Sequence, residues 1–188
     1  FAAAIATDGK ASITSCDVHA HKAELIAKGA ERLGLPITAQ QQDATVFRPE
    51  WEHSFDAVIV DAPCSGYGII RKKPDIRYKD PASMAELPAL QLAILNNQAT
   101  YVKPGGVLLY STCTLTYEEN EGMVKAFLNE RNDFSLLGQL HVDKERTHQH
   151  HRHKTCVEQD GDQRICQRHG QRGSFFILDQ CAIDAVKS

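Results

Sequence analysis

The stretch Ala57-Val58-Ile59-Val60-Asp61-Ala62-Pro63-Cys64-Ser65-Gly66 decides how this chain is expected to fold. Its apolar start predicts a buried strand, and the Pro, Ser and Gly that follow are typical of the turn after a strand. A second stretch, Val107-Leu108-Leu109-Tyr110-Ser111-Thr112-Cys113-Thr114, also places a cysteine just after an apolar strand. In an open parallel sheet, the carboxyl ends of the strands line the ligand crevice. We therefore expect Asp61, Cys64 and Cys113 to converge at one edge of a sheet.

Strands and helices are expected to alternate along the rest of the chain. Apolar residues at helical spacing predict a helix at 22–33, and the patterns Ser83-x-x-Glu86 and Thr116-x-x-Glu119 predict capping boxes for two more, the first helix running to about Val102. The expected strands are residues 11–16, 37–41, 55–60, 107–111, 134–137 and 175–183. Alternation of this kind is typical of an α/β fold with parallel pairing.

Composition sets limits on the class of protein. With 188 residues, of which 42% are hydrophobic and 24% charged, the chain is one globular domain or most of one. A net charge of −3 gives no general nucleic-acid signature, so contacts with a nucleic acid would have to come from a local basic patch. No apolar stretch approaches the roughly 20 residues that span a bilayer, which argues against a membrane protein. Six cysteines without a C-x-x-C pair fit reduced thiols in a cytoplasmic protein.

Both cysteine motifs resemble those of one enzyme family. The RNA 5-methylcytosine methyltransferases, and especially their bacterial ribosomal RNA branch, pair a Pro-Cys and a Thr-Cys motif around one cytosine, as Pro63-Cys64 and Thr112-Cys113 would do here. The resemblance implies S-adenosyl-L-methionine as cofactor, RNA as partner and methylation of cytosine in small-subunit ribosomal RNA, with transfer RNA as the near alternative. DNA cytosine methyltransferases have no Thr-Cys partner, so Cys113 argues against a DNA substrate.

The chemistry explains why two thiols and a carboxylate would meet at one base. Carbon 5 of cytosine is a poor nucleophile, and addition of a thiolate to carbon 6 makes it reactive by turning the ring into an enamine. Cysteine suits this step because it is nucleophilic and leaves readily afterwards. The resemblance makes Cys113 the nucleophile, gives Cys64 a part in breakdown of the adduct, and places Asp61 at the cytosine edge near the methyl donor. A lone cysteine at a strand end is otherwise an inert core residue.

Aspartates at the ends of the earlier strands fit a nucleotide-type cofactor. Asp17 follows the strand expected at 11–16, and an acidic residue at this place commonly accepts hydrogen bonds from ribose hydroxyls in Rossmann-like folds. By the resemblance, Asp43 would face the adenine amino group and Lys22 would add a ribose contact. Strand-end aspartates also serve as turn formers and helix caps, so each has a purely structural alternative.

A basic segment follows the Pro-Cys loop. Arg71, Lys72 and Lys73 stand together, and the resemblance assigns them to RNA binding with Pro63; such basic side chains would pair with phosphates beside the target base. The alternative is a merely solvated charged stretch. Another polar tract, His148–His153, holds four histidines. A solvated loop is favoured there over a metal site, because no matching ligand cluster is visible.

The resemblance also implies an architecture. The expected sheet is a Rossmann-like, S-adenosyl-L-methionine-dependent methyltransferase sheet, mostly parallel with an antiparallel terminal strand. Its first strand, its glycine-rich cofactor turn and an N-terminal RNA-binding domain have no counterpart in this sequence. Residues 1–188 are therefore expected to be a partial catalytic domain that has an upstream domain of the same protein as partner and is inactive alone.

Two functions from other classes remain as alternatives. The chain could be a non-catalytic RNA-binding module with a degenerate methyltransferase fold, although the retention of Asp61, Cys64 and Cys113 speaks against decay. A thiol redox protein is disfavoured, because no C-x-x-C motif begins a helix.

Overall fold

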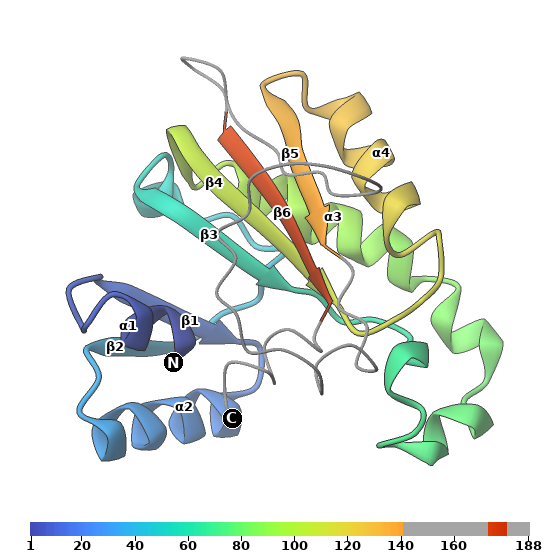
Figure 1. Ribbon diagram of the computed structural model, residues 1–188, viewed down its shortest axis with the longest axis horizontal. Coiled ribbons are helices and arrows are strands. Elements are labelled where there is room, and N and C mark those ends of the chain that lie inside the picture. Colours follow the sequence, from blue (N-terminus) through green and yellow to red (C-terminus); the bar gives the residue numbers. More distant parts are fainter. Residues whose placement is uncertain (141–172, 180–188) are drawn as a thin grey trace, which may run out of the picture. The chain divides into compact units, whose positions relative to one another are not determined.

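The chain forms two compact units. The computed structural model describes residues 1–140 and 173–179, and within it the first unit covers Phe1–Arg48 while the second begins at Pro49. Each unit has its own sheet, of two strands in the first and four in the second (Figure 1).

The first unit is a strand–helix–strand motif. β1 (Ile13–Asp17) and β2 (Ile37–Gln41) pair in parallel, and α2 (Ala20–Leu33) connects them. Gly34 ends α2 with a φ of 63°, a left-handed conformation that glycine adopts without steric penalty. A short helix, α1 (Ala2–Ala6), precedes β1. The parallel pairing brings the carboxyl ends of β1 and β2 side by side.

The second unit contains a sheet with the strand order β3–β4–β6–β5. Its strands are β3 (Phe55–Asp61), β4 (Val102–Thr112), β5 (Phe134–Leu140) and β6 (Gly173–Asp179). Every neighbouring pair is parallel. β3 and β4 carry the two cysteine motifs and are neighbours, with Asp61 opposite Ser111. This confirms the α/β class with parallel pairing.

The expectation of an antiparallel terminal strand is wrong. β6 runs parallel to β4 on one side and to β5 on the other. A parallel neighbour needs a crossover of about a dozen residues or more, and the chain between Leu140 and Gly173 is well above that length. The apolar pattern that predicts a strand has the same period in either direction, so the sequence of β6 could not reveal its direction.

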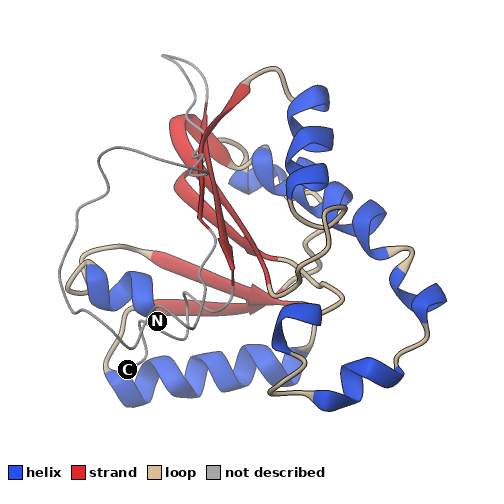
Figure 2. Ribbon diagram, turned by 45° about the vertical axis from the view of Figure 1, so that its right-hand side comes forward, coloured by secondary structure: helices blue, strands red, loops and turns tan. Residues whose placement is uncertain are grey.

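Two helices cover one face of this sheet (Figure 2). α3 (Leu87–Ala99) packs against β3 and β4, while α4 (Glu121–Glu130) packs against α3 and β5. Large side chains with 0% exposure form the core between the two helices and the sheet, namely Leu95, Leu108, Tyr110 and Phe127. Burial of an apolar side chain of this size stabilises the fold by about 1.5–3 kcal/mol. Four 3-10 helices complete the described part: η1 (Pro49–Trp51), η2 (Tyr67–Ile69), η3 (Pro74–Tyr78) and η4 (Pro81–Met84).

The capping box expected at Ser83 does not form. Ser83 lies in η4 and donates its hydroxyl to the carbonyl oxygen of Asp80 at 2.6 Å. α3 begins only at Leu87, with Pro88 in its first turn, where the missing N–H is not needed by the helix. It also ends earlier than expected, at Ala99.

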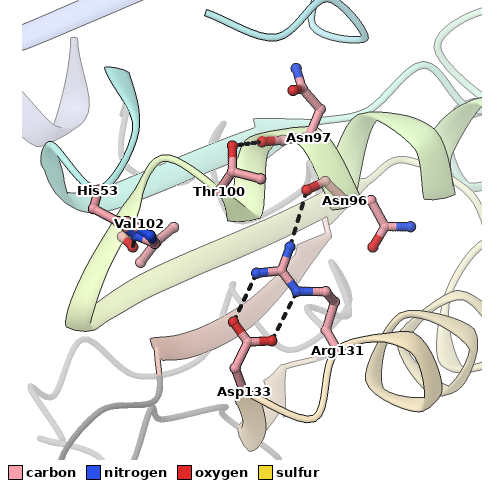
Figure 3. Close-up of polar contacts among 7 residues, drawn as sticks. All are labelled: His53, Asn96, Asn97, Thr100, Val102, Arg131 and Asp133. Carbon is pink, nitrogen blue, oxygen red and sulfur yellow. Dashed lines mark hydrogen bonds and ion pairs between the residues drawn. The ribbon is translucent and has the colours of Figure 1, made fainter. Parts of the chain in front are cut away.

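Polar contacts of Arg131 tie the end of α4 to α3 (Figure 3). Its guanidinium donates to both carboxylate oxygens of Asp133, at 2.9 and 2.8 Å, and to the carbonyl oxygen of Asn96 at 3.3 Å. It also lies 5.2 Å from the ring centroid of Phe134, the first residue of β5. A forked arginine–carboxylate pair is stronger than a single surface contact, so Arg131 joins α3, α4 and β5.

We expect Arg131→Ala to lower the free energy of unfolding by about 1–2 kcal/mol, because Asp133 and the Asn96 carbonyl lose the donor that they share. Urea denaturation followed by circular dichroism measures this change. The control is Lys125→Ala, at an exposed position of α4, which should change the value by less than about 0.5 kcal/mol. Equal losses in both variants would contradict a structural role for the Arg131 contacts.

Candidate active site

The cysteines of the two motifs meet, as expected. Cys64 lies in the loop after β3, Cys113 directly follows β4, and their sulfur atoms are 3.0 Å apart. The backbone N–H of Cys113 also donates to the Cys64 sulfur at 3.2 Å. Both are free thiols and half-buried, so a reagent or substrate has access to them.

The contact between the sulfurs favours a thiolate at Cys64. The hydrogen bond from the Cys113 side chain is the largest cause that lowers the pKa of Cys64, and the N–H groups of Cys113 and Gly66 lower it further. Burial and the charge of Glu119 act in the opposite direction. The net result is a pKa of Cys64 below its ordinary value, which is the direction that activates a cysteine for nucleophilic chemistry.

Asp61 ends β3 at the same edge of the sheet. Its side chain is exposed, and the hydroxyl of Ser111 donates to its Oδ1 at 3.1 Å. The backbone N–H of Ala62 donates to the Ser111 carbonyl oxygen at 3.0 Å, which continues the pairing of β3 with β4 beyond Asp61. One carboxylate oxygen is thereby oriented from β4, and an exposed acceptor stands at the strand ends that carry the cysteines.

Two glycines let the loop after Cys64 approach Cys113. Gly66 has a φ of 79°, and a Cβ there would lie 3.1 Å from Ile76 and 3.9 Å from the Cys113 sulfur. The N–H of Gly68 donates to the Cys113 carbonyl oxygen at 3.0 Å, and a Cβ on Gly68 would lie 2.9 Å from that oxygen. Sequence analysis missed this approach, although the glycine–tyrosine–glycine spacing is a signal for it.

The basic segment follows these glycines. Arg71, Lys72 and Lys73 are exposed and lie between η2 and η3. Gly68 of η2 is bonded to Cys113, and the buried Ile76 of η3 lies over Gly66. Both flanks of the basic segment are thus anchored beside Cys113, although the sequence alone placed it only next to the Pro-Cys loop.

The aspartates of the first unit lie at the expected strand ends. Oδ1 of Asp17 accepts from the N–H of His19 at 2.9 Å, and its Oδ2 lies 3.6 Å from Nζ of Lys22. Oδ1 of Asp43 accepts from the hydroxyl and the N–H of Thr45 at 2.7 and 2.8 Å, which lowers the pKa of Asp43. Such local bonds are typical of turns, so both aspartates have a structural task whether or not they also bind a cofactor.

Beneath the cysteines lies a buried polar network that sequence analysis missed. Glu119 is 4% exposed, and its carboxylate accepts from the N–H of Ser65, the amide of Gln91 and the hydroxyl of Thr116, each at 2.9 Å. Burial acts to raise the pKa of Glu119, but hydrogen bonds from the same three residues outweigh it and hold the pKa below its ordinary value. The capping box expected at Thr116-x-x-Glu119 is wrong, because α4 begins only at Glu121.

The part of the chain that the structure describes contains neither a helix that could span a membrane nor a candidate metal site. None of the helices at residues 1–140 is long and apolar enough to cross a membrane. Within the same residues and 173–179, no group of three or more His, Cys, Asp or Glu side chains could hold a metal ion. The histidine tract His148–His153 lies outside the described residues.

Cys113→Ala is expected to raise the pKa of Cys64, because it removes the hydrogen bond that contributes most to lowering it. Alkylation of Cys64 by iodoacetamide at neutral pH should then become slower, since the thiolate is the reactive form. Peptide mass spectrometry after timed alkylation at a series of pH values gives the profile, with the exposed Cys16 as internal reference. An unchanged Cys64 profile would contradict the proposed cause.

Comparison with known proteins identifies the family. The family model for 16S rRNA methyltransferase RsmB/F matches residues 2–179. The chain is 48% identical over 128 residues to the probable ribosomal RNA small subunit methyltransferase B of Bacillus subtilis, which covers 66% of this chain and 29% of that protein. It is 43% identical over 125 residues to ribosomal RNA small subunit methyltransferase B of Thermus thermophilus, covering 66% and 31%.

A solved structure supports the same relationship. NSun6 from Pyrococcus horikoshii with SFG matches with a TM-score of 0.62 and 29% identity, over 71% of this chain and 34% of that chain. The matched part of the chain spans less than a third of the length of the two curated relatives from Bacillus subtilis and Thermus thermophilus. Because the family model extends over nearly all of the sequence, the chain belongs to the 16S rRNA methyltransferase RsmB/F family.

Proposed function

We propose that this chain is part of the catalytic domain of an S-adenosyl-L-methionine-dependent enzyme that methylates carbon 5 of a cytosine in small-subunit ribosomal RNA. The observation that carries the proposal is the 3.0 Å contact between the sulfurs of Cys64 and Cys113. Asp61 stands at the same edge of β3 and β4. The names of the curated relatives, ribosomal RNA small subunit methyltransferase B, support the substrate class.

Cys113 is the proposed nucleophile. Its thiolate adds to carbon 6 of the cytosine, which moves the ring electrons toward carbon 5 and makes that carbon nucleophilic. The contact between the sulfurs lowers the pKa of Cys64. When Cys64 is ionised, the Cys113 proton can move along this contact to Cys64, which leaves the negative charge on Cys113. Asp61 would accept a hydrogen bond from the amino edge of the base and hold it in place.

Cys64 is proposed to act after methyl transfer. S-adenosyl-L-methionine supplies the methyl group when bound. The proton on carbon 5 must then pass to water, its bonding electrons form the double bond between carbons 5 and 6, and the bond between carbon 6 and the Cys113 sulfur breaks to release a thiolate. Cys64, protonated by the earlier shift, can return its proton to that thiolate. The sulfur of Cys64 is next to the sulfur that departs, which supports a part in this breakdown.

The cofactor would be held by the strand-end aspartates. Asp17 ends β1 and Asp43 follows the adjacent parallel strand β2, and their carboxylates offer acceptors that match ribose hydroxyls and the adenine amino group. Their bonds to the local turns leave further lone pairs on the oxygens. Lys22 lies within ion-pair distance of Asp17 and would add a donor to the ribose. Asp61 is proposed to face the methyl donor as well as the base.

RNA would meet the site through the basic segment. Arg71, Lys72 and Lys73 are exposed on a loop whose flanks are bonded or packed beside Cys113. Phosphate contacts position a nucleic acid without reading its sequence. Pro63 precedes Cys64 and would border the base. This arrangement supports a target cytosine bound next to the thiols.

The two thiols should have separable roles in a complete enzyme that includes this chain. Cys113→Ala should abolish both methylation and the covalent protein–RNA species, because no other group attacks carbon 6. Cys64→Ala should still attack, since a cysteine can also release its proton to solvent, but should release RNA slowly and accumulate the adduct. Labelled S-adenosyl-L-methionine, separate ribosomal and transfer RNA pools and denaturing gels measure both effects. Cys16→Ala is the control; an adduct in Cys113→Ala and none in Cys64→Ala would reverse the assignment.

Removal of the three positive charges at Arg71, Lys72 and Lys73 should weaken RNA binding for all sequences alike. If all three contact phosphates of a single strand, the slope of log affinity against log salt should fall by up to about 2. Filter binding at several salt concentrations measures the slope. The matched control removes the same charge at Lys10, Lys28 and Lys125, which are exposed elsewhere. Equal slopes in the two triple variants would show that the basic segment is merely solvated and does not contact RNA phosphates.

A further inference from the structure

We propose that Glu119 and Asn120 are positioning residues that together set the contact between the two cysteine sulfurs, because each holds the chain on both sides of one cysteine. The catalytic meaning of this inference rests on the proposed function, whereas the geometry does not. Neither residue touches a reacting atom in the mechanism above. Their task would be to hold the Cys64 loop and the Cys113 loop at the positions that bring the two sulfurs into contact.

Glu119 holds the loop of Cys64 through hydrogen bonds. Its Oε2 accepts from the backbone N–H of Ser65, the residue after Cys64. The same oxygen accepts from the amide of Gln91, which also donates to the carbonyl oxygen of Pro63, the residue before Cys64, at 2.8 Å. Gln91 is 0% exposed, so water does not compete for these bonds. One buried carboxylate therefore fixes both neighbours of Cys64.

Asn120 holds the loop of Cys113 in the same way. Its Oδ1 accepts from the hydroxyl of Thr112, the residue before Cys113, at 2.7 Å. Its amide donates to the carbonyl oxygens of Thr114 and Thr116, at 3.1 and 2.8 Å. Asn120 occupies the N-cap position of α4, where an asparagine usually bonds the helix N–H groups, yet its side chain makes no such bond. It is used for the cysteine loop instead.

Further contacts connect the two halves. The hydroxyls of Ser65 and Thr114, each the residue after a cysteine, are 2.6 Å apart. The hydroxyl of the buried Tyr110 lies 2.9 Å from the Glu119 carbonyl oxygen and 3.0 Å from the Gln91 amide oxygen. Because Glu119 and Asn120 are adjacent in the chain, a shift of either loop has to strain the other.

The charge of Glu119 has a second measurable effect, because it raises the pKa of Cys64. The titratable groups that act on Cys64 are Cys113, through the hydrogen bond, and Glu119, through its negative charge, while Tyr110 faces both Cys64 and Glu119. A glutamine at 119 can keep its oxygen toward Ser65 and Gln91 and turn its amide toward the hydroxyl of Thr116, which can accept. Glu119→Gln therefore removes the charge and keeps the bonds, whereas Glu119→Ala removes both.

The test uses the proximity of the thiols in the 188-residue chain, without RNA or cofactor. Diamide oxidises the thiol pair to a disulfide by taking up two electrons and two protons, and mass spectrometry follows its formation. Glu119→Ala should slow formation of the Cys64–Cys113 disulfide, per thiolate, by at least about tenfold, because the sulfurs lose their held orientation. It should also raise the pKa of Cys64, since the Cys113 hydrogen bond is the larger influence. Glu119→Gln should keep the wild-type disulfide rate per thiolate and lower the pKa of Cys64.

Glu118→Gln is the matched control, because it removes the same charge one residue away, at an exposed position. Its disulfide rate and Cys64 profile should equal those of the wild type. A wild-type disulfide rate in Glu119→Ala would overturn the inference. If Glu119→Ala does not fold, Glu119→Gln still tests the inference, because a slowed disulfide in a variant that keeps the bonds would contradict their proposed role. Normal results in these thiol assays with no methylation by a complete enzyme would speak against the proposed function alone.

Discussion

The hydrogen bond between the Glu119 carboxylate and the backbone N–H of Ser65 is the constraint on which the cysteine site depends. A charged group that is 4% exposed is tolerated only when its oxygens are fully paired. The donors that satisfy it come from the loop after β3, from α3 and from the loop after β4, at Ser65, Gln91 and Thr116. Pairing one buried charge thus requires three separate parts of the second unit to converge where the two cysteines lie.

The strand pattern predicted most of the fold, and each of its failures has a physical cause. The apolar run located β3 almost to the residue, because turn residues follow it directly. β2 also has the expected bounds, although it is short and mostly polar. β4 begins at Val102, earlier than expected, since Val102 already pairs with Phe55 although the residues after it look like a turn. The direction of β6 depends on how distant chain segments pack, so no local pattern could predict it.

The sequence predicts the parts of the site that depend on strand topology, and it does not predict the parts that depend on side-chain packing. The rule that ligands gather at the carboxyl ends of parallel strands was enough to bring Cys64 and Cys113 together. The network around Glu119 was not predictable, because a Thr-x-x-Glu pattern before a helix favours a capping box. Only the three-dimensional structure shows that Glu119 turns inward to Ser65 and Gln91. Polar residues at loop positions look alike in sequence whether they are solvated or buried.

The candidate residues are divided between the two units. Cys64, Cys113 and Glu119 belong to the second unit, and their described contacts are made within it. Of the proposed cofactor residues, Asp17, Asp43 and Lys22 belong to the first unit and Asp61 belongs to the second. The pKa of Cys64 is governed by its surroundings in the second unit, chiefly by the Cys113 thiol, which lowers it, and by burial, which raises it, while the Glu119 charge has a smaller effect. A substitution at Asp17 or Asp43 therefore removes none of the described contacts that hold the two cysteine loops together.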